Sequence, residues 1–193
     1  TLPMHKFSIV SYFDDENTKE IREIQEKLSK ITGSLGSLVA WTPHITVGSG
    51  VSVGENQIEE FYQTIEDFLS DFRTTSLKTK EFSFMDNWSG SKLGFTPYVV
   101  YIKPFDYGTL SAAASFFEEQ IKPRYPVWYD QPWPYNPHIT VAYKDLTEDG
   151  YNKAREYLLG KTFEREITID NVCLAIQDKN GAWKEFKHFH LKK

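Results

Sequence analysis

The chain has 193 residues, of which 40% are hydrophobic, 25% are charged and 16% are aromatic. This composition is that of a globular protein with one domain or two small lobes, and it excludes a disordered or fibrous chain. The formal net charge of −5 argues against a protein that coats long duplex DNA or RNA, because affinity for such polymers depends on neutralising phosphates. A small nucleotide needs only a few local donors and stays compatible with this charge.

Two features that the sequence lacks limit the compartment in which we expect the protein. Cys173 is the only cysteine, so neither an internal disulfide nor a zinc cluster built from several cysteines can form. No run of about 18 apolar residues occurs and the N-terminus lacks the pattern of a signal peptide, so no membrane span and no membrane partner are expected. We therefore expect a soluble, cytoplasmic monomer.

The first half of the chain predicts five elements in order. Residues 6–13 are rich in β-branched and aromatic side chains and predict a strand. Apolar residues at helical spacing predict a helix from Asn17 to Gly33, and residues 39–47 predict the next strand. A second helix is expected over residues 58–72, with its acidic residues largely on the solvent side, and a strand over residues 80–86.

A loop containing Gly, Ser and Pro at residues 87–97 is the expected division of the chain, after which the order of elements starts again. The elements predicted there are a strand at 97–105, a helix from Leu110 to Ile121 with Thr109 as its candidate cap, a strand at the second histidine motif, a helix from the cap Thr147 to Gly160, and strands at 165–178 and 183–192 joined by a hairpin at Asn180-Gly181.

The two halves thus repeat one order: strand, helix, strand, helix, strand. We predict a single domain over residues 1–193 that arose by internal duplication, with one lobe over about 5–87 and the other over about 97–192. The fold class is α+β, a bilobed pseudo-twofold duplicate of two antiparallel sheets with helices outside and a central groove. A doubly wound parallel sheet would also fit the alternation, but no Gly-rich phosphate turn follows any strand.

The pentapeptide Pro-His-Ile-Thr-Val occurs at residues 43–47 and again at 137–141. Because alternate side chains of a strand point to opposite faces, each histidine shares a face with its threonine, while the isoleucine and valine face the core. The polar residues that this pattern places on the groove are His44, Thr46, His138 and Thr140.

These four residues suit acid–base chemistry at a phosphoryl group. One imidazole can be neutral while the other is protonated at the same pH, as a paired general base and general acid require. Threonine hydroxyls can donate to a non-bridging phosphoryl oxygen. A zinc site is the competing use of two histidines, but the motif faces supply no carboxylate or thiolate, so we expect no metal and no cofactor.

The doubled His-x-Thr-x motif resembles the two-histidine phosphoesterase superfamily, the LigT-like group. This group contains 2′,3′-cyclic nucleotide phosphodiesterases, RNA 2′,3′-cyclic phosphodiesterases also called 2′-5′ RNA ligases, and 2′-5′ oligoadenylate phosphodiesterases. The resemblance covers both halves and implies a bilobed fold with the motifs in its groove, and catalytic roles for the four motif residues. Many bacterial members carry Arg five residues after the second motif histidine, where this chain has Tyr143. The adjacent Lys144 falls on the catalytic face by strict alternation and can supply the charge instead.

Aromatic residues beside the motifs are the candidates for stacking on a nucleobase, which is worth about 1–3 kcal/mol per base. Trp41 precedes the first motif, and four more lie in the loop that enters the second: Trp128, Tyr129, Trp133 and Tyr135. Trp133 and Tyr135 are favoured because they are nearest to His138; the alternative is that they pack a Pro-rich loop onto the body. The expected substrate-binding residues are Trp41, Trp133, Tyr135, Tyr143 and Lys144.

Two histidines near the C-terminus carry a weaker metal signal. His188 and His190 share one strand face, but a solvated face is the favoured interpretation because lysines surround them. Cys173 lies in an apolar stretch and is expected in the core.

The expected function is that of a metal-independent phosphodiesterase that opens 2′,3′-cyclic phosphates of nucleotides or RNA ends. Two alternatives stay open. One is a phosphodiesterase that cleaves 2′-5′ or 3′-5′ linkages of linear or cyclic oligonucleotide signals, and the other is a non-catalytic nucleotide-binding module. The expected partner is a nucleotide or a short oligonucleotide.

Overall fold

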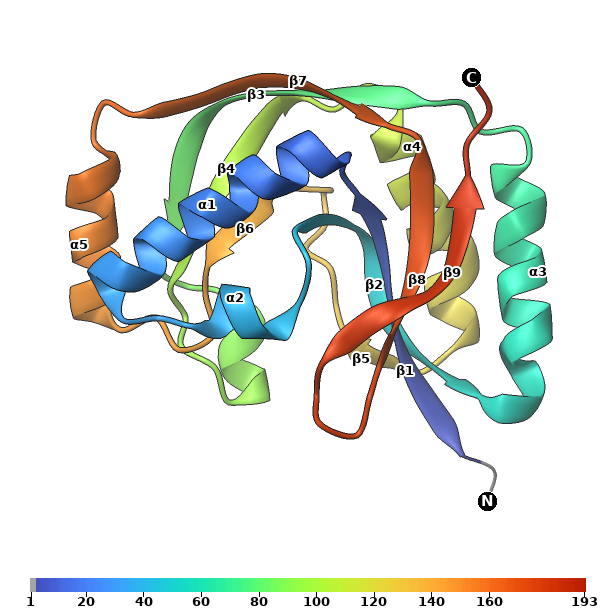
Figure 1. Cartoon of the computed structure of the whole chain (residues 1–193). Coiled ribbons are helices and arrows are strands. Elements are labelled where there is room, and N and C mark those ends of the chain that lie inside the picture. The colour runs from blue at the N-terminus through green and yellow to red at the C-terminus, as the bar shows by residue number, and fades with distance from the viewer. Residues whose placement is uncertain (1–2) are drawn as a thin grey trace.

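A computed structural model describes residues 3–193 and shows two antiparallel sheets, one of five strands and one of four (Figure 1). The five-stranded sheet has the order β5-β2-β1-β8-β9, and the four-stranded sheet has the order β6-β4-β3-β7. The strands are β1 (Met4–Tyr12), β2 (His44–Gly54), β3 (Thr75–Met85), β4 (Val99–Asp106), β5 (Val127–Tyr129), β6 (Ile139–Ala142), β7 (Thr162–Ile169), β8 (Asn171–Gln177) and β9 (Trp183–His190). The predicted α+β class with two antiparallel sheets is confirmed.

The helices lie outside the sheets, as predicted. They are α1 (Asp15–Thr32), α2 (Gly36–Ala40), α3 (Ile58–Leu69), α4 (Leu110–Phe116) and α5 (Glu148–Leu158), with short helical turns η1 (Glu55–Gln57), η2 (Ser89–Leu93), η3 (Phe117–Ile121) and η4 (Lys122–Arg124). Helices α1 and α5 pack against β6 and β4 of the four-stranded sheet, whereas α3 and α4 pack against β2 of the five-stranded sheet (Figure 1). No helix among residues 3–193 is long and apolar enough to span a bilayer.

Local capping sets the ends of the longer helices. The Asp14 carboxylate accepts a bond from the amide of Asn17 at the start of α1, and Gly33 ends that helix with a φ of 78°. Thr147 caps α5 through the amide of Gly150, as predicted. Thr109 stands at the N-cap of α4 but makes no side-chain capping bond, so that expectation was wrong.

Each sheet takes strands from both halves of the sequence. β3, from the first half, pairs with β4 and β7, whereas β8, from the second half, pairs with β1. The stretch 165–178, predicted as one strand, breaks at Asp170 into the end of β7 in one sheet and β8 in the other. The predicted loop at 87–97 therefore divides the sequence but does not divide the sheets.

The first histidine strand begins later than predicted. Residues 36–40 form α2, so residues 39 and 40 are helix instead of strand. The Asp145 carboxylate holds the start of this helix: it accepts bonds from the Ser34 hydroxyl at 2.5 Å and from the amides of Leu35 and Gly36 at 3.0 Å each. These amides lie at the start of a helix, where they have no partner within the helix. A tertiary contact thus makes an apolar stretch helical, and β2 runs from His44 to Gly54 instead of residues 39–47.

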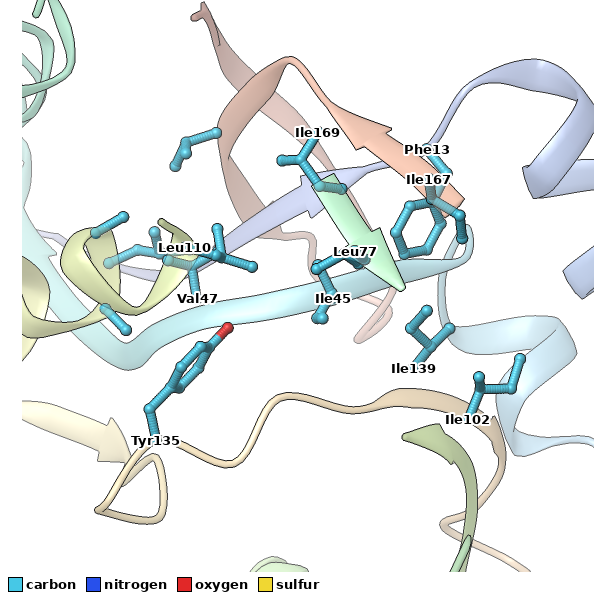
Figure 2. Close-up of a cluster of buried hydrophobic side chains, with 14 of the residues drawn as sticks. Phe13, Ile45, Val47, Leu77, Ile102, Leu110, Tyr135, Ile139, Ile167 and Ile169 are labelled. Carbon is cyan, nitrogen blue, oxygen red and sulfur yellow. The ribbon is translucent and has the colours of Figure 1, made fainter. Parts of the chain in front are cut away.

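One hydrophobic core joins the inner faces of the two sheets. Ile45, Val47, Ile139 and Val141 are all at most 1% exposed, as the alternation of the two pentapeptides predicts. Figure 2 shows Ile45 of β2 beside Leu77 of β3 and near Ile139 of β6, and Val47 of β2 beside Leu110 of α4. Because burying one such side chain is worth about 1.5–3 kcal/mol, this shared core holds the two motif strands in place.

Candidate active site

A cavity of about 260 Å³ lies where the two motif strands meet, and residues of both sheets line it. His44 and Thr46 reach it from β2, Thr140 reaches it from β6, and His138 reaches it from the position just before β6. The structure therefore brings together the four motif residues that the sequence singles out.

The two histidines are oriented by the same backbone contact. His44 Nδ1 lies 2.8 Å from the carbonyl oxygen of Thr42, and His138 Nδ1 lies 2.9 Å from that of Asn136. A carbonyl oxygen can only accept, so Nδ1 carries the proton in the neutral ring and Nε2 keeps its lone pair. In each imidazole Nε2 is thus the nitrogen that can accept a proton, and the same contact recurs in both halves of the chain.

Burial disfavours the charged form of both rings. It lowers the pKa of His44 to about 4, and the positive charges of His138 and Lys144 add to this, while the bond to the Thr42 carbonyl opposes it. Burial also lowers the pKa of His138, and the bond to the Asn136 carbonyl oxygen partly opposes this. Both rings are therefore neutral near pH 7 in the ligand-free protein. The expected pairing of one neutral and one protonated ring near pH 7 does not hold in that state.

Buried polar groups hold the motif backbones. The Gln25 amide donates to the Thr140 carbonyl oxygen at 3.1 Å, and the Ser37 hydroxyl donates to that of Val141 at 2.9 Å. The Tyr135 hydroxyl donates to the Thr46 carbonyl oxygen at 2.7 Å, and its tip points toward β2 in Figure 2. Tyr135 is only 9% exposed and does not line the cavity, so it supports β2 and is not a stacking surface for a base.

Trp41 lies directly against the first histidine. Its ring stacks on that of His44 with centroids 3.8 Å apart, and its Nε1 donates to the Tyr12 hydroxyl at 2.9 Å. Arg22 fixes the same segment by donating to the carbonyl oxygens of Ser37 and Trp41. Trp41 therefore both lines the cavity and limits the orientation of His44.

Tyr143 and Lys144 line the cavity beyond the end of β6. Strict alternation does not place Lys144, because β6 ends at Ala142 and Lys144 has a left-handed φ of 73°. Its Nζ lies 5.0 Å from the ring centroid of Phe95 and 5.3 Å from that of Tyr143. Burial lowers the pKa of this ammonium, and the negative charge of Asp145 opposes the shift. A partly dehydrated cation thus stands beside the histidine pair.

Most of the aromatic residues that line the cavity are not the ones favoured by their closeness to His138 in the sequence. Trp183 stacks between Trp41 and Trp128, with centroids 5.0 and 5.2 Å away. Trp133, one of the two favoured, is 49% exposed and is not among the lining residues. The further aromatic residues that line the cavity are Trp88, Phe95, Trp128, Tyr129 and Trp183.

Gly50 is the sequence signal that points to Trp128. A glycine inside a strand often marks the close approach of another group, and a Cβ at Gly50 would collide with the Trp128 ring. Pairing of β5 with β2, Gly50 opposite Tyr129, brings the aromatic loop onto the strand that carries the first motif. The position of Trp183, in contrast, follows only from the pairing of β8 with β1 and β9.

Comparisons with known proteins agree with this geometry. A model of the 2′-5′ RNA ligase superfamily matches residues 14–181. E. coli LigT in complex with 3′-AMP has a TM-score of 0.68 at 12% identity, covering 99% of this chain and 100% of that one. TT0787 of Thermus thermophilus has a TM-score of 0.62 at 15% identity, covering 97% of this chain and 98% of that one. A comparison with curated protein sequences finds no match.

The solved structures share the fold, and the family model spans both pentapeptides. The chain therefore belongs to the 2′-5′ RNA ligase superfamily.

Proposed function

We propose that this phosphoesterase opens 2′,3′-cyclic phosphates of nucleotides or RNA ends by paired histidine catalysis without a metal ion. The observation that carries the proposal is the matched pair of imidazoles on one cavity, each held through Nδ1 by a backbone carbonyl. This arrangement leaves two Nε2 atoms for proton transfer and two threonine hydroxyls for the phosphoryl oxygens. E. coli LigT has been solved with 3′-AMP, and a 3′-nucleotide is one of the two products that opening a cyclic phosphate gives.

In the proposed reaction a water molecule attacks phosphorus while His44 Nε2 takes its proton. His44 is assigned as the base because the charges of His138 and Lys144 add to the burial that keeps it neutral. The bond from phosphorus to one ribose oxygen breaks, and protonated His138 gives that oxygen its proton. The anionic phosphate supplies the negative charge that favours a protonated ring in the cavity, so binding of substrate produces the charged acid.

The phosphate of the bound substrate needs hydrogen-bond donors, and so does the negative charge that develops on it during the reaction. The hydroxyls of Thr46 and Thr140 lie on the cavity and suit the non-bridging oxygens. Lys144 supplies the positive charge in place of the arginine that many bacterial members carry. Its contacts with Phe95 and Tyr143 limit the positions that the ammonium can take.

A second candidate is cleavage of a 2′-5′ or 3′-5′ linkage between two nucleosides. It is favoured by aromatic residues from two parts of the cavity. Trp41 and Trp183 stack together beside His44, and Trp88 and Phe95 lie parallel with an interplanar angle of 4° near Tyr143. Two such surfaces suit a substrate with a base on each side of the scissile phosphate.

The test is incubation with 2′,3′-cyclic mononucleotides, 2′-5′ dinucleotides and cyclic dinucleotides, with products separated by chromatography. We expect turnover of the cyclic mononucleotides, and a loss of about 10²–10⁴-fold in His44→Gln and in His138→Gln. His5→Gln removes a histidine that does not line the cavity and is the control. Turnover confined to dinucleotides would support the second candidate. Binding of nucleotides without any turnover would identify a binding module and refute both.

A further inference from the structure

A cluster of three different side chains joins β8 to the edge strand β9. Cys173 is paired opposite His188 across the two strands, and Glu185 lies three residues before His188. Cys173 Sγ lies 3.2 Å from His188 Nδ1, His188 Nδ1 lies 3.0 Å from Glu185 Oε1, and Glu185 Oε1 lies 3.7 Å from Cys173 Sγ. Three potential ligand atoms of different chemistry thus form a small triangle.

The triangle has the size of one face of a tetrahedral zinc site. Zinc bonds of about 2.0–2.1 Å to nitrogen, 2.0–2.2 Å to oxygen and 2.3 Å to sulfur place neighbouring ligand atoms about 3.3–3.6 Å apart. The Glu185–Cys173 separation of 3.7 Å lies at the upper end of this range, and the two separations from His188 Nδ1, 3.0 and 3.2 Å, are shorter. Thiolate, imidazole and carboxylate are also the three ligand classes that zinc takes in proteins.

Hydrogen bonds alone do not give every polar atom of this cluster a short contact. The Glu185 carboxylate can accept from both the Cys173 thiol and His188 Nδ1–H, but its contact with the thiol is the longest of the three, at 3.7 Å. The thiol also lies 3.4 Å from Asn171 Oδ1, an oxygen that it shares with the amide of Tyr12 at 2.9 Å. A cation at the centre of the triangle would satisfy all three groups at once.

We propose that Cys173, Glu185 and His188 bind a zinc ion, with water completing the tetrahedron on the side where Glu185 reaches solvent. Cys173 is buried, as expected, and the proposal adds a ligand role to it and to His188. The single cysteine excludes sites built from several thiolates, but it does not exclude a site with one.

The ion would act as a structural clamp and take no part in the phosphodiester chemistry. β8 and β9 are the last two strands of the five-stranded sheet, separated from the motif strand β2 by β1. β9 begins at Trp183, whose ring stacks on Trp41, and Trp41 in turn stacks on His44. Fixing β9 to β8 therefore fixes one wall of the cavity.

The test uses the untagged full chain, stripped with chelator, desalted and titrated with zinc against a chromophoric chelator. We expect one zinc per chain, a higher Tm with zinc, and affinity about 100-fold or more weaker in Glu185→Gln and His188→Gln, since even partners behind a ligand are worth 10–100-fold. Cobalt should give a near-ultraviolet thiolate band that Cys173→Ala abolishes. His5→Gln controls for histidines outside the cluster.

Glu185 has a half-exposed side chain, so Glu185→Gln is expected to fold even if a change at buried Cys173 does not. Zinc binding no tighter in the wild type than in Glu185→Gln, or cobalt binding without the thiolate band, would overturn the proposal. The cluster would then be a hydrogen-bonded one, with the thiol turned toward Asn171. Neither result bears on the proposed reaction, which is measured separately on cyclic phosphates.

Discussion

Protonation of His44 should weaken the fold, because burial holds its pKa at about 4 while an exposed imidazole has a pKa of about 6.5. Between these two values the unfolded chain binds more protons than the folded one, so stability falls as the pH falls and levels off below about 4. At 1.36 kcal/mol per pKa unit, the full difference corresponds to about 3 kcal/mol, of which about 2 kcal/mol is already lost at pH 5.

The assay is urea unfolding of the wild type and of His44→Gln at pH 7 and at pH 5. Other groups also titrate over this range, including His138, so the informative quantity is the difference between the two proteins. We expect the free energy of unfolding to fall by about 2 kcal/mol more in the wild type than in the variant. His5→Gln, which replaces a histidine outside the cavity, should keep the wild-type dependence.

An NMR titration of the imidazole carbon-bound protons measures the pKa of His44 directly. A value of 6 or above would refute the reasoning, because the cavity would then be wet enough to solvate the charged ring. If the free energy of unfolding depends on pH equally in the wild type and in His44→Gln, the reasoning is also refuted.

Three further predictions concern catalysis. His138→Gln should lose much less turnover on a nitrophenyl phosphodiester than on a cyclic phosphate, because a nitrophenolate leaves without a proton; equal losses on both would reassign His138 to holding the phosphate. The kcat of Glu185→Gln, which lacks one ligand of the proposed zinc clamp, should be the same with and without excess EDTA, since no metal touches the proposed reaction; a loss in this variant that zinc or manganese restores would contradict this. Lys144→Met should raise KM for a cyclic phosphate about 10-fold, the worth of one charge-assisted contact, whereas Lys92→Met, outside the cavity, should leave KM unchanged.

The sequence by itself determined the two motif strands and their polar faces. A period of two is a local property of a strand, so His44 and Thr46 had to share one face and Ile45 and Val47 the other whichever strands lay beside them. Capping of α1 by Asp14 and of α5 by Thr147 is local in the same way. Identity of the two pentapeptides then indicated that both faces serve one site.

Only the tertiary structure decided which strands are neighbours and what else lines the cavity. The crossing of the chain between sheets at Asp170 depends on partners that lie far away in sequence, and so does the helical state of residues 36–40, which Asp145 stabilises. Trp183 faces the cavity because β8 pairs with β1, whereas Trp133, nearer to His138 in sequence, does not. The low pKa of His44 belongs to the same class, because desolvation arises from residues that meet only after folding.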